Sequence, residues 1–185
     1  MKQYTIYSDL HRGHPYEIKP KIKFSKNTVF LGDNFDIKNT SKKELSKVTK
    51  ERAETIKAIK STGGIYVSGN HSLKNLKDHQ VIRDRILFIH GDIIDYGPIA
   101  AKKWRLSKTP GRNEAYRKFL QIYRKIYPHP RTPRKKYLDK ASELAKKNNC
   151  HTICFGHFHP KKVIDVKNNG IRIVAVPRGM TKIIL

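Results

Sequence analysis

Five short apolar runs, rich in β-branched and aromatic residues, form the clearest pattern along the chain. Each run is followed closely by Gly, Asp or Asn, and short apolar runs that end in this way are typical of buried strands. Each also carries a polar motif at its carboxyl end, so five polar clusters are expected to meet on one rim of a sheet, where open sheets usually bind ligands. The predicted strands are Tyr4–Tyr7, Thr28–Leu31, Ile65–Val67, Ile86–Ile89 and His151–Phe155.

Between the predicted strands, apolar residues at helical spacing predict two helices. The Ser41–Glu44 segment has the spacing of a capping box, which predicts a helix over residues 41–60 that packs on the sheet. Thr132 before Pro133 offers an N-cap with proline at the first helical position, which predicts another helix that ends at about Lys147. The positions expected to face the core are Leu45, Val48, Ile56 and Ile59 in the first helix, and Tyr137, Leu138, Ala141 and Leu144 in the second.

A further aromatic stripe, from Tyr116 to Tyr127, predicts a helix over about residues 112–127. Near the carboxyl end, apolar runs separated by turn residues predict antiparallel strands, with a turn at residues 168–170. The chain is therefore expected to fold as one α/β domain over residues 1–185, with a two-layered β core and a helical insertion at about residues 96–148. The late strands are Val163–Val166, Ile171–Val176 and Thr181–Leu185.

The polar motifs supply carboxylate, amide and imidazole groups. Hard divalent cations prefer oxygen ligands whereas imidazole suits borderline metals, so a mixed set of Asp, Asn and His indicates a pair of transition-metal ions. Two neighbouring ions need a bridging oxygen ligand, and the carboxylate of Asp33 is the natural candidate. The motifs are Asp9-Leu10-His11, Gly32-Asp33-Asn34-Phe35-Asp36, Gly69-Asn70-His71, His90-Gly91-Asp92 and Gly156-His157-Phe158-His159.

In type and order these motifs resemble the D-x-H, GDxxD, GNH, isolated His and GHxH motifs of the calcineurin-like metallophosphoesterase family, and they span the chain from Asp9 to His159. The resemblance implies a four-layer αββα sandwich and hydrolysis of a P–O bond by metal-bound hydroxide. The His-Gly-Asp form of the fourth motif, with a helical insertion after it, is similar to the branch that contains UDP-2,3-diacylglucosamine hydrolases. Ser72 stands where the family usually has an acidic residue, which leaves the orientation of His71 open.

The resemblance also implies roles for individual side chains. His71 would face the substrate phosphate and protonate the leaving group or stabilise the transition state, while Asp36 and Asp92 would support the metal ligands from behind. The cofactor would be two divalent metal ions, Mn²⁺ in the first place, with Fe²⁺, Zn²⁺ or Ni²⁺ as alternatives. The implied ligands are Asp9, His11, Asp33 and His159 for the first ion, and Asp33, Asn70, His90 and His157 for the second.

Three residues outside the ligand set are candidates for substrate binding. Arg12 could clamp a phosphate, because its planar fork of donors matches phosphate geometry. His14 is close enough in sequence to reach the site, although a loop histidine without a motif is more often incidental, and Trp104 fits no helical stripe and could make an exposed contact. Cys150 and Cys154 have neither metal-knuckle nor redox spacing, so neither is expected to bind zinc.

Positive charge is the second informative feature. The 185 residues include 40 Lys and Arg against 15 Asp and Glu, a formal net charge of +25, which favours acidic substrates. From Lys102 to Lys136 there are 13 basic residues and one acidic residue, interleaved with aromatic ones. Such a segment could bind nucleic acid, although the same pattern also fits an ordinary helix with a buried aromatic stripe and a solvated basic face.

Three functions remain open on this basis. A phosphoesterase acting on a small phosphodiester, pyrophosphate or phosphomonoester is slightly favoured; the alternatives are a nuclease and a non-catalytic nucleic-acid-binding module on the same fold. No apolar run approaches the roughly 20 residues of a membrane span, and the N-terminus begins in a predicted strand, so a cytoplasmic protein is the simplest expectation. The oligomeric state is left undetermined.

Overall fold

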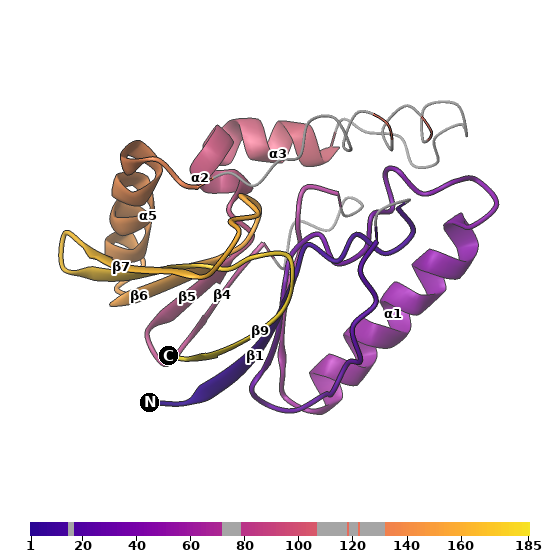
Figure 1. The fold of residues 1–185 in the computed structure, drawn as a ribbon, viewed down its shortest axis with the longest axis horizontal. Helices are drawn as coiled ribbons and strands as arrows, with labels where there is room; N and C mark the ends of the chain where they lie inside the picture. Colours follow the sequence, from indigo (N-terminus) through magenta and orange to yellow (C-terminus); the bar gives the residue numbers. More distant parts are fainter. Residues whose placement is uncertain (15–16, 72–78, 107–117, 119–121, 123–131) are drawn as a thin grey trace.

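Two β-sheets packed face to face form the centre of the molecule (Figure 1). The computed structural model describes residues 1–14, 17–71, 79–106, 118, 122 and 132–185. Helix α1 covers the outer face of one sheet and helix α5 that of the other, which confirms the four layers αββα expected from the sequence. The elements are β1 (Gln3–Ser8), β2 (Thr28–Leu31), α1 (Leu45–Ser61), β3 (Ile65–Val67), β4 (Gln80–Arg83), β5 (Ile86–Ile89), α2 (Asp92–Tyr96), α3 (Pro98–Leu106), α5 (Lys135–Lys147), β6 (Thr152–Phe155), β7 (Ile164–Asn168), β8 (Ile171–Ala175) and β9 (Gly179–Ile184).

The strand order places four of the five motif-bearing strands (β1, β2, β5 and β6) inside the two sheets, whereas β3 lies at the edge of the first. The first sheet has the order β3-β2-β1-β9, in which the first three strands run parallel and β9 pairs antiparallel with β1. The second has the order β4-β5-β6-β8-β7, in which β5, β6 and β8 run parallel between two antiparallel edge strands. None of the described helices is long and apolar enough to cross a membrane.

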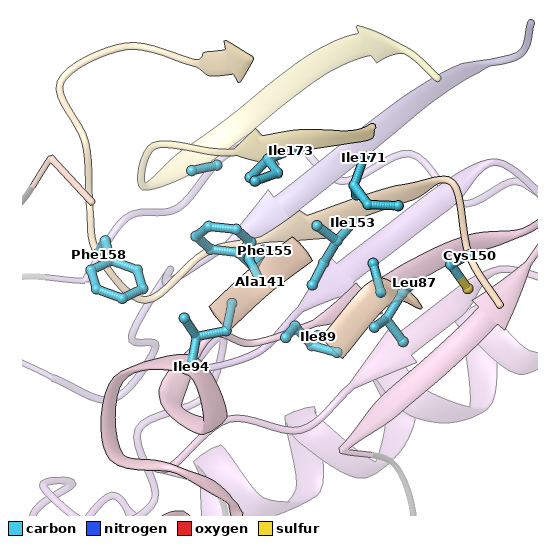
Figure 2. Packing of buried hydrophobic residues seen from close by; sticks show 12 residues of the cluster. Leu87, Ile89, Ile94, Ala141, Cys150, Ile153, Phe155, Phe158, Ile171 and Ile173 are labelled. Carbon is cyan, nitrogen blue, oxygen red and sulfur yellow. The ribbon is translucent and has the colours of Figure 1, made fainter. Parts of the chain in front are cut away.

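Side-chain alternation along the strands separates three apolar clusters. In β5, Ile86 and Phe88 face the first sheet, whereas Leu87 and Ile89 face α5 on the opposite side. Figure 2 shows the cluster on the α5 side, where Ala141 of that helix packs over the sheet. The central strands are therefore buried on both faces, which explains why their sequences are continuously apolar rather than alternating.

Helix α1 is shorter at its start than the sequence predicts. Ser41 and Glu44 form the expected reciprocal contacts, because the Ser41 hydroxyl donates to Oε2 of Glu44 at 2.9 Å and accepts its backbone N–H at 3.3 Å. These contacts close a separate turn, and the helix itself begins at Leu45. The predicted inward stripe is confirmed: Val48 and Ile59 are buried in the cluster beneath α1.

Helix α5 also begins later than predicted. Its N-cap position is Arg134 and its first helical residue is Lys135, so the expected cap at Thr132 with Pro133 as first helical residue is wrong. The inward-facing positions are confirmed, since all four contact the cluster shown in Figure 2. The predicted helix at about residues 112–127 falls almost wholly outside the described residues.

The residues at the turns explain why one hairpin was predicted from the sequence and another was not. The β7–β8 hairpin turns at Asn169 and Gly170, with φ of 49° and 81°, as the Asn-Gly signal predicts. The β4–β5 hairpin was not predicted, because Asp84 and Arg85 take up φ of 52° and 57° without an Asn or Gly to announce the turn. β9 is antiparallel as expected, but its partner is β1 in the other sheet.

Candidate metal centre

The ends of five strands bring the motif side chains to one rim. Five of the candidate ligands have φ between 46° and 70°, a left-handed conformation that residues other than glycine rarely adopt. The chain therefore turns sharply at the ligands themselves, and backbone strain of this kind is concentrated at functional sites. The strained ligands are Asp9 and His11 after β1, Asp33 after β2, and His157 and His159 after β6.

Two motif glycines allow the strand ends to approach closely. A Cβ at Gly69 would collide with the carboxylate and main chain of Asp33. A Cβ at Gly156 would collide with the hydroxyl of Ser8 and would lie 2.6 Å from Oδ2 of Asp9. These carboxylates are buried, so a larger residue at either position would displace a candidate ligand.

Asp9, His11 and His159 form the first group of converging ligand atoms. Oδ2 of Asp9 accepts hydrogen bonds from the Ser8 hydroxyl at 2.6 Å and from the His157 backbone N–H at 3.0 Å. Oδ1 then faces Nε2 of His159 at 3.0 Å and Nε2 of His11 at 4.0 Å. This oxygen is buried and makes no contact of hydrogen-bond geometry with the described residues, as expected of an atom that binds a cation.

Asp33, His90 and His157 form a second group, with Asn70 beside them. Nε2 of His90 lies 3.1 Å from Oδ2 of Asp33, 3.1 Å from Oδ1 of Asn70 and 3.3 Å from Nδ1 of His157. Ligand atoms bonded to one ion at about 2.1 Å are separated by roughly 3.0 to 3.4 Å, so these spacings fit a single ion. The donor types, carboxylate, amide and imidazole, fit a divalent transition metal.

A third group links the first two through His71. Its Nδ1 lies 2.8 Å from Oδ1 of Asp36, and its Nε2 lies 3.8 Å from Oδ2 of Asp33. The second oxygen of Asp36 lies 3.1 Å from Nδ1 of His11, and the side-chain amide of Asn39 donates to both oxygens at 2.9 and 3.0 Å. One carboxylate therefore supports a candidate ligand and the candidate catalytic histidine together.

The buried carboxylates are held in their charged form by the imidazoles around them. Burial alone would raise the pKa of Asp9, Asp33 and Asp36, but neighbouring histidines outweigh it and hold all three pKa values well below the usual range. Burial opposes protonation of His90, yet the charge of Asp33 outweighs it and raises the pKa of His90 to about 9. In His11 burial prevails and lowers the pKa. The carboxylates of Asp9, Asp33 and Asp36 are therefore ionised at neutral pH.

Three further predicted residues, two after the first motif and one in α2, contact neighbouring elements of the fold. Arg12 forms an ion pair with Glu51 of α1. His14 is buried, with its ring edge-on to that of His11 at 6.2 Å between centroids. Asp92 is fully buried at the start of α2, and its charge contributes to the raised pKa of His90 in the second group. Substrate binding by Arg12 and His14, and support of the metal ligands by Asp92, stay predictions.

Two predicted positions lie beyond what the structure describes. Ser72 is outside the described residues, as is the side chain of Trp104, which belongs to α3. The same holds for most of the basic segment between residues 102 and 136. Cys154 is buried between the two sheets and Cys150 is buried beneath α5; both are free thiols outside the groups of candidate ligands.

Three residues near the rim were not predicted from the sequence. Asn39 could have been found, because Asp side chains commonly bond to nearby backbone groups, and Oδ1 of Asp36 accepts the backbone N–H of Asn39 at 3.0 Å. Nothing local marks the other two. Oδ2 of Asp95 lies 3.3 Å from Nε2 of His157, 62 positions away in the sequence. Nε of Arg178 donates at 3.1 Å to the main-chain oxygen of Asp9, 169 positions away.

Comparison with known proteins identifies a family. The family model described as calcineurin-like phosphoesterase matches residues 3–161. No curated protein matches the chain.

Solved structures similar to this chain come from several organisms. Vacuolar protein sorting 29 from Cryptosporidium parvum is 15% identical with a TM-score of 0.48, over 95% of this chain and 74% of that one. A conserved uncharacterized protein from Streptococcus pneumoniae TIGR4, titled a predicted phosphoesterase, is 13% identical with a TM-score of 0.43, over 96% of this chain and 74% of that one. A cold-active protein-tyrosine phosphatase of a psychrophilic Shewanella species is 16% identical with a TM-score of 0.47, over 95% of this chain and 71% of that one.

Proposed function

Because this chain belongs to the calcineurin-like phosphoesterase family, we propose that it is a dinuclear metal-dependent phosphoesterase acting on a small phosphodiester or pyrophosphate. The observation that carries the proposal is the position of Asp33. Its carboxylate converges with His11, which also belongs to the group with Asp9 and His159, and it converges with His90 and His157 of the second group. Two neighbouring ions require a shared oxygen ligand of this kind.

Both ions would be divalent, with Mn²⁺ as the first candidate and Fe²⁺, Zn²⁺ or Ni²⁺ as alternatives, because several ligands are imidazoles. When bound, the two ions would supply an activated water and would neutralise charge on the phosphoryl oxygens. The residues that would hold them are Asp9, His11, Asp33 and His159 for one ion, and Asp33, Asn70, His90 and His157 for the other.

His71 would act on the leaving group rather than on a metal. Nδ1 of His71 lies 2.8 Å from Oδ1 of Asp36, so that Nδ1–H would donate to this carboxylate, while Nε2 is directed toward Asp33 and the rim. The side chain of His71 is 18% exposed, whereas that of His90 is fully buried. The ring is therefore open to a substrate on part of its surface, and Nε2 would hold the proton that passes to the leaving oxygen.

The small-molecule substrate is supported by the His-Gly-Asp form of the fourth motif, which resembles the diacylglucosamine hydrolase branch. An acyl-chain substrate is less well supported, because the predicted insertion is rich in Lys, Arg and Tyr rather than in long aliphatic residues. A nuclease is the second candidate. It is favoured by the net charge of +25 and by the 13 basic residues between Lys102 and Lys136.

An activity screen with Mn²⁺ tests the proposal. Substrates would be an aryl phosphodiester, an aryl phosphomonoester, a UDP-sugar pyrophosphate, and single- and double-stranded oligonucleotides. We expect two ions per chain by elemental analysis and turnover of the small diester or pyrophosphate, both lost in Asp33→Asn. Turnover of oligonucleotides alone would favour the nuclease. Bound metal without turnover of any substrate would favour a non-catalytic nucleic-acid-binding module.

A further inference from the structure

The ring of His157 is in contact through both of its nitrogens. Nδ1 lies 3.3 Å from Nε2 of His90 and so faces the second ligand group. Nε2 points the other way and lies 3.3 Å from Oδ2 of Asp95 in helix α2. A neutral imidazole carries one proton, so the nitrogen that donates to a carboxylate determines which nitrogen keeps its lone pair.

We propose that Asp95 is a positioning residue, which accepts the Nε2–H of His157 and so holds its Nδ1 lone pair toward the second metal site. The inference rests on the proposed function, since the metal site is the one assigned there. Asp95 touches neither metal nor substrate in this role. It acts through His157 by fixing the tautomer and the orientation of the ring.

The other buried histidines of the site are held in the same way. Nδ1 of His11 faces Asp36 at 3.1 Å while its Nε2 faces the first group. Nδ1 of His90 faces the main-chain oxygen of Leu31 at 3.3 Å while its Nε2 faces the second group. Metal-binding histidines generally donate their second N–H to a carboxylate or carbonyl, which fixes the tautomer and raises ligand basicity. Asp95 completes this pattern for His157.

Helix α2 places Asp95 firmly. Its N-cap is Gly91, which has φ of 107° and whose main-chain oxygen accepts the backbone N–H of Asp95 at 3.1 Å. Ile94 is 2% exposed and packs into the cluster beneath α5 (Figure 2). The neighbouring Tyr96 ring stands edge-on to that of His157, with 5.6 Å between centroids. The side chain of Asp95 is only 10% exposed, so its contact with His157 is shielded from water.

The negative charge of Asp95 should also raise the metal affinity of the second site. Asp33 is the one carboxylate among the four residues assigned to the second ion. Asp95 lies one imidazole ring further out and is partly shielded from solvent, where charges are screened less than at the surface. An isosteric amide at this position would keep a hydrogen-bond acceptor and lose the charge. The two contributions are therefore separable by mutation.

The test compares Asp95→Ala and Asp95→Asn with Glu143→Gln as a matched control. Glu143 is an exposed carboxylate on α5 that lines the same cleft as Ile93 and Ile94 of α2, so it controls for loss of negative charge near this helix. Long-range ¹H–¹⁵N spectra of the metal-free protein at about pH 10, where the neighbouring His90 with its pKa of about 9 is also largely neutral, report the tautomer of His157. Calorimetric titration with Mn²⁺ gives the affinity of each site.

We expect wild type, Glu143→Gln and Asp95→Asn to hold His157 with its proton on Nε2, and Asp95→Ala to show a mixture of tautomers. Mn²⁺ affinity at one of the two sites should fall by about 10- to 100-fold in Asp95→Ala and by less in Asp95→Asn. An unchanged tautomer in Asp95→Ala would overturn the inference. So would an equal loss of affinity at both sites in Asp95→Ala and Asp95→Asn, because that pattern indicates general disruption of α2.

The outcome is separable from that of the proposed function. If the wild type binds Mn²⁺ but hydrolyses no phosphoester, the proposed activity fails while the spectra and the titration still decide the role of Asp95. If the activity is found and the tautomer of His157 is indifferent to residue 95, the phosphoesterase stands and the positioning role falls.

Discussion

His71 is oriented by Asp36: Nδ1 of the imidazole lies 2.8 Å from Oδ1 of the carboxylate, although the two residues are 35 positions apart. The same carboxylate lies 3.1 Å from Nδ1 of His11. The acidic residue that usually follows Asn-His is replaced by Ser72 in this chain. The contact with Asp36 shows that His71 has a carboxylate partner from another motif, so its orientation does not depend on an acid at position 72.

His71→Ala should separate catalysis from metal binding. The proposed ligands do not include His71, so we expect metal content near that of the wild type and a kcat lower by about 10²- to 10⁴-fold, the usual range for a positioned acid or base. Elemental analysis and steady-state kinetics on the same preparation measure both quantities. Asp33→Asn is the contrasting variant and should lose metal. Equal metal loss in the two variants would contradict separate roles.

Asp36→Asn should affect both properties at once. Its charge supports His11 as well as His71, so we expect a lower kcat together with metal affinity weakened by about 10- to 100-fold. Asn39→Ala removes the amide that holds Asp36 and that also lies 2.9 Å from Nδ1 of His71, and it should give smaller changes in the same direction. Calorimetric titration with Mn²⁺ beside kinetics measures them. A kinetic defect with unaltered Mn²⁺ affinity would show that the contact with His11 is unimportant for metal binding.

Removal of metal should abolish turnover and lower stability. A ligand that binds only the folded state stabilises it by about 2.7 kcal/mol at 100 times its Kd, so Mn²⁺ should raise the Tm of protein treated with a chelator. Asp33→Asn serves as the control whose Tm should respond little to Mn²⁺. Full activity after exhaustive chelation would rule out the metal mechanism.

Gly156→Ala should lower the free energy of unfolding, because the added Cβ has no room between the strand ends. The added Cβ collides with the Ser8 hydroxyl and approaches Oδ2 of Asp9 to 2.6 Å, and overpacking of this kind costs about 1 to 3 kcal/mol. Denaturant unfolding of the metal-free protein measures the change in free energy. Adding Ser8→Ala removes one of the colliding atoms and should restore part of the stability. A Gly156→Ala protein as stable as the wild type would show that the strand ends can separate without cost.

Charge reversal in the basic segment should separate the two substrate classes. If this segment binds a polyanion, affinity for a single-stranded oligonucleotide should fall with salt, with a log–log slope of roughly −0.7 per phosphate contact. The variant should then lose oligonucleotide cleavage and keep turnover of an aryl phosphodiester. Cleavage that is indifferent to charge reversal would remove the nuclease alternative. The positions to reverse are Arg112, Lys118, Arg124 and Lys125.

Local pattern determined which strands carry the chemistry. The runs before Asp9, Asp33 and His157 are apolar and β-branched, and each ends at a turn residue, so period and composition alone predict buried strands with polar ends. The Asn-Gly turn between β7 and β8 was visible for the same reason, whereas the turn at Asp84 and Arg85 was hidden because its residues are ordinary. Residue types likewise indicated a transition-metal pair before any fold was known.

Only the tertiary structure decided which distant side chains meet. The sequence predicted that Asp36 supports the metal ligands, and the fold adds that the turn after β2 places it between His11 and His71. Asp95 lies 62 positions from His157, and their contact exists because β5 and β6 are neighbours and α2 folds back over their ends. β9 joins β1 rather than β8 for a similar reason: strand order depends on the burial of whole sheet faces. Sequence periodicity reports the environment of one residue at a time, whereas such contacts depend on how all the layers pack together.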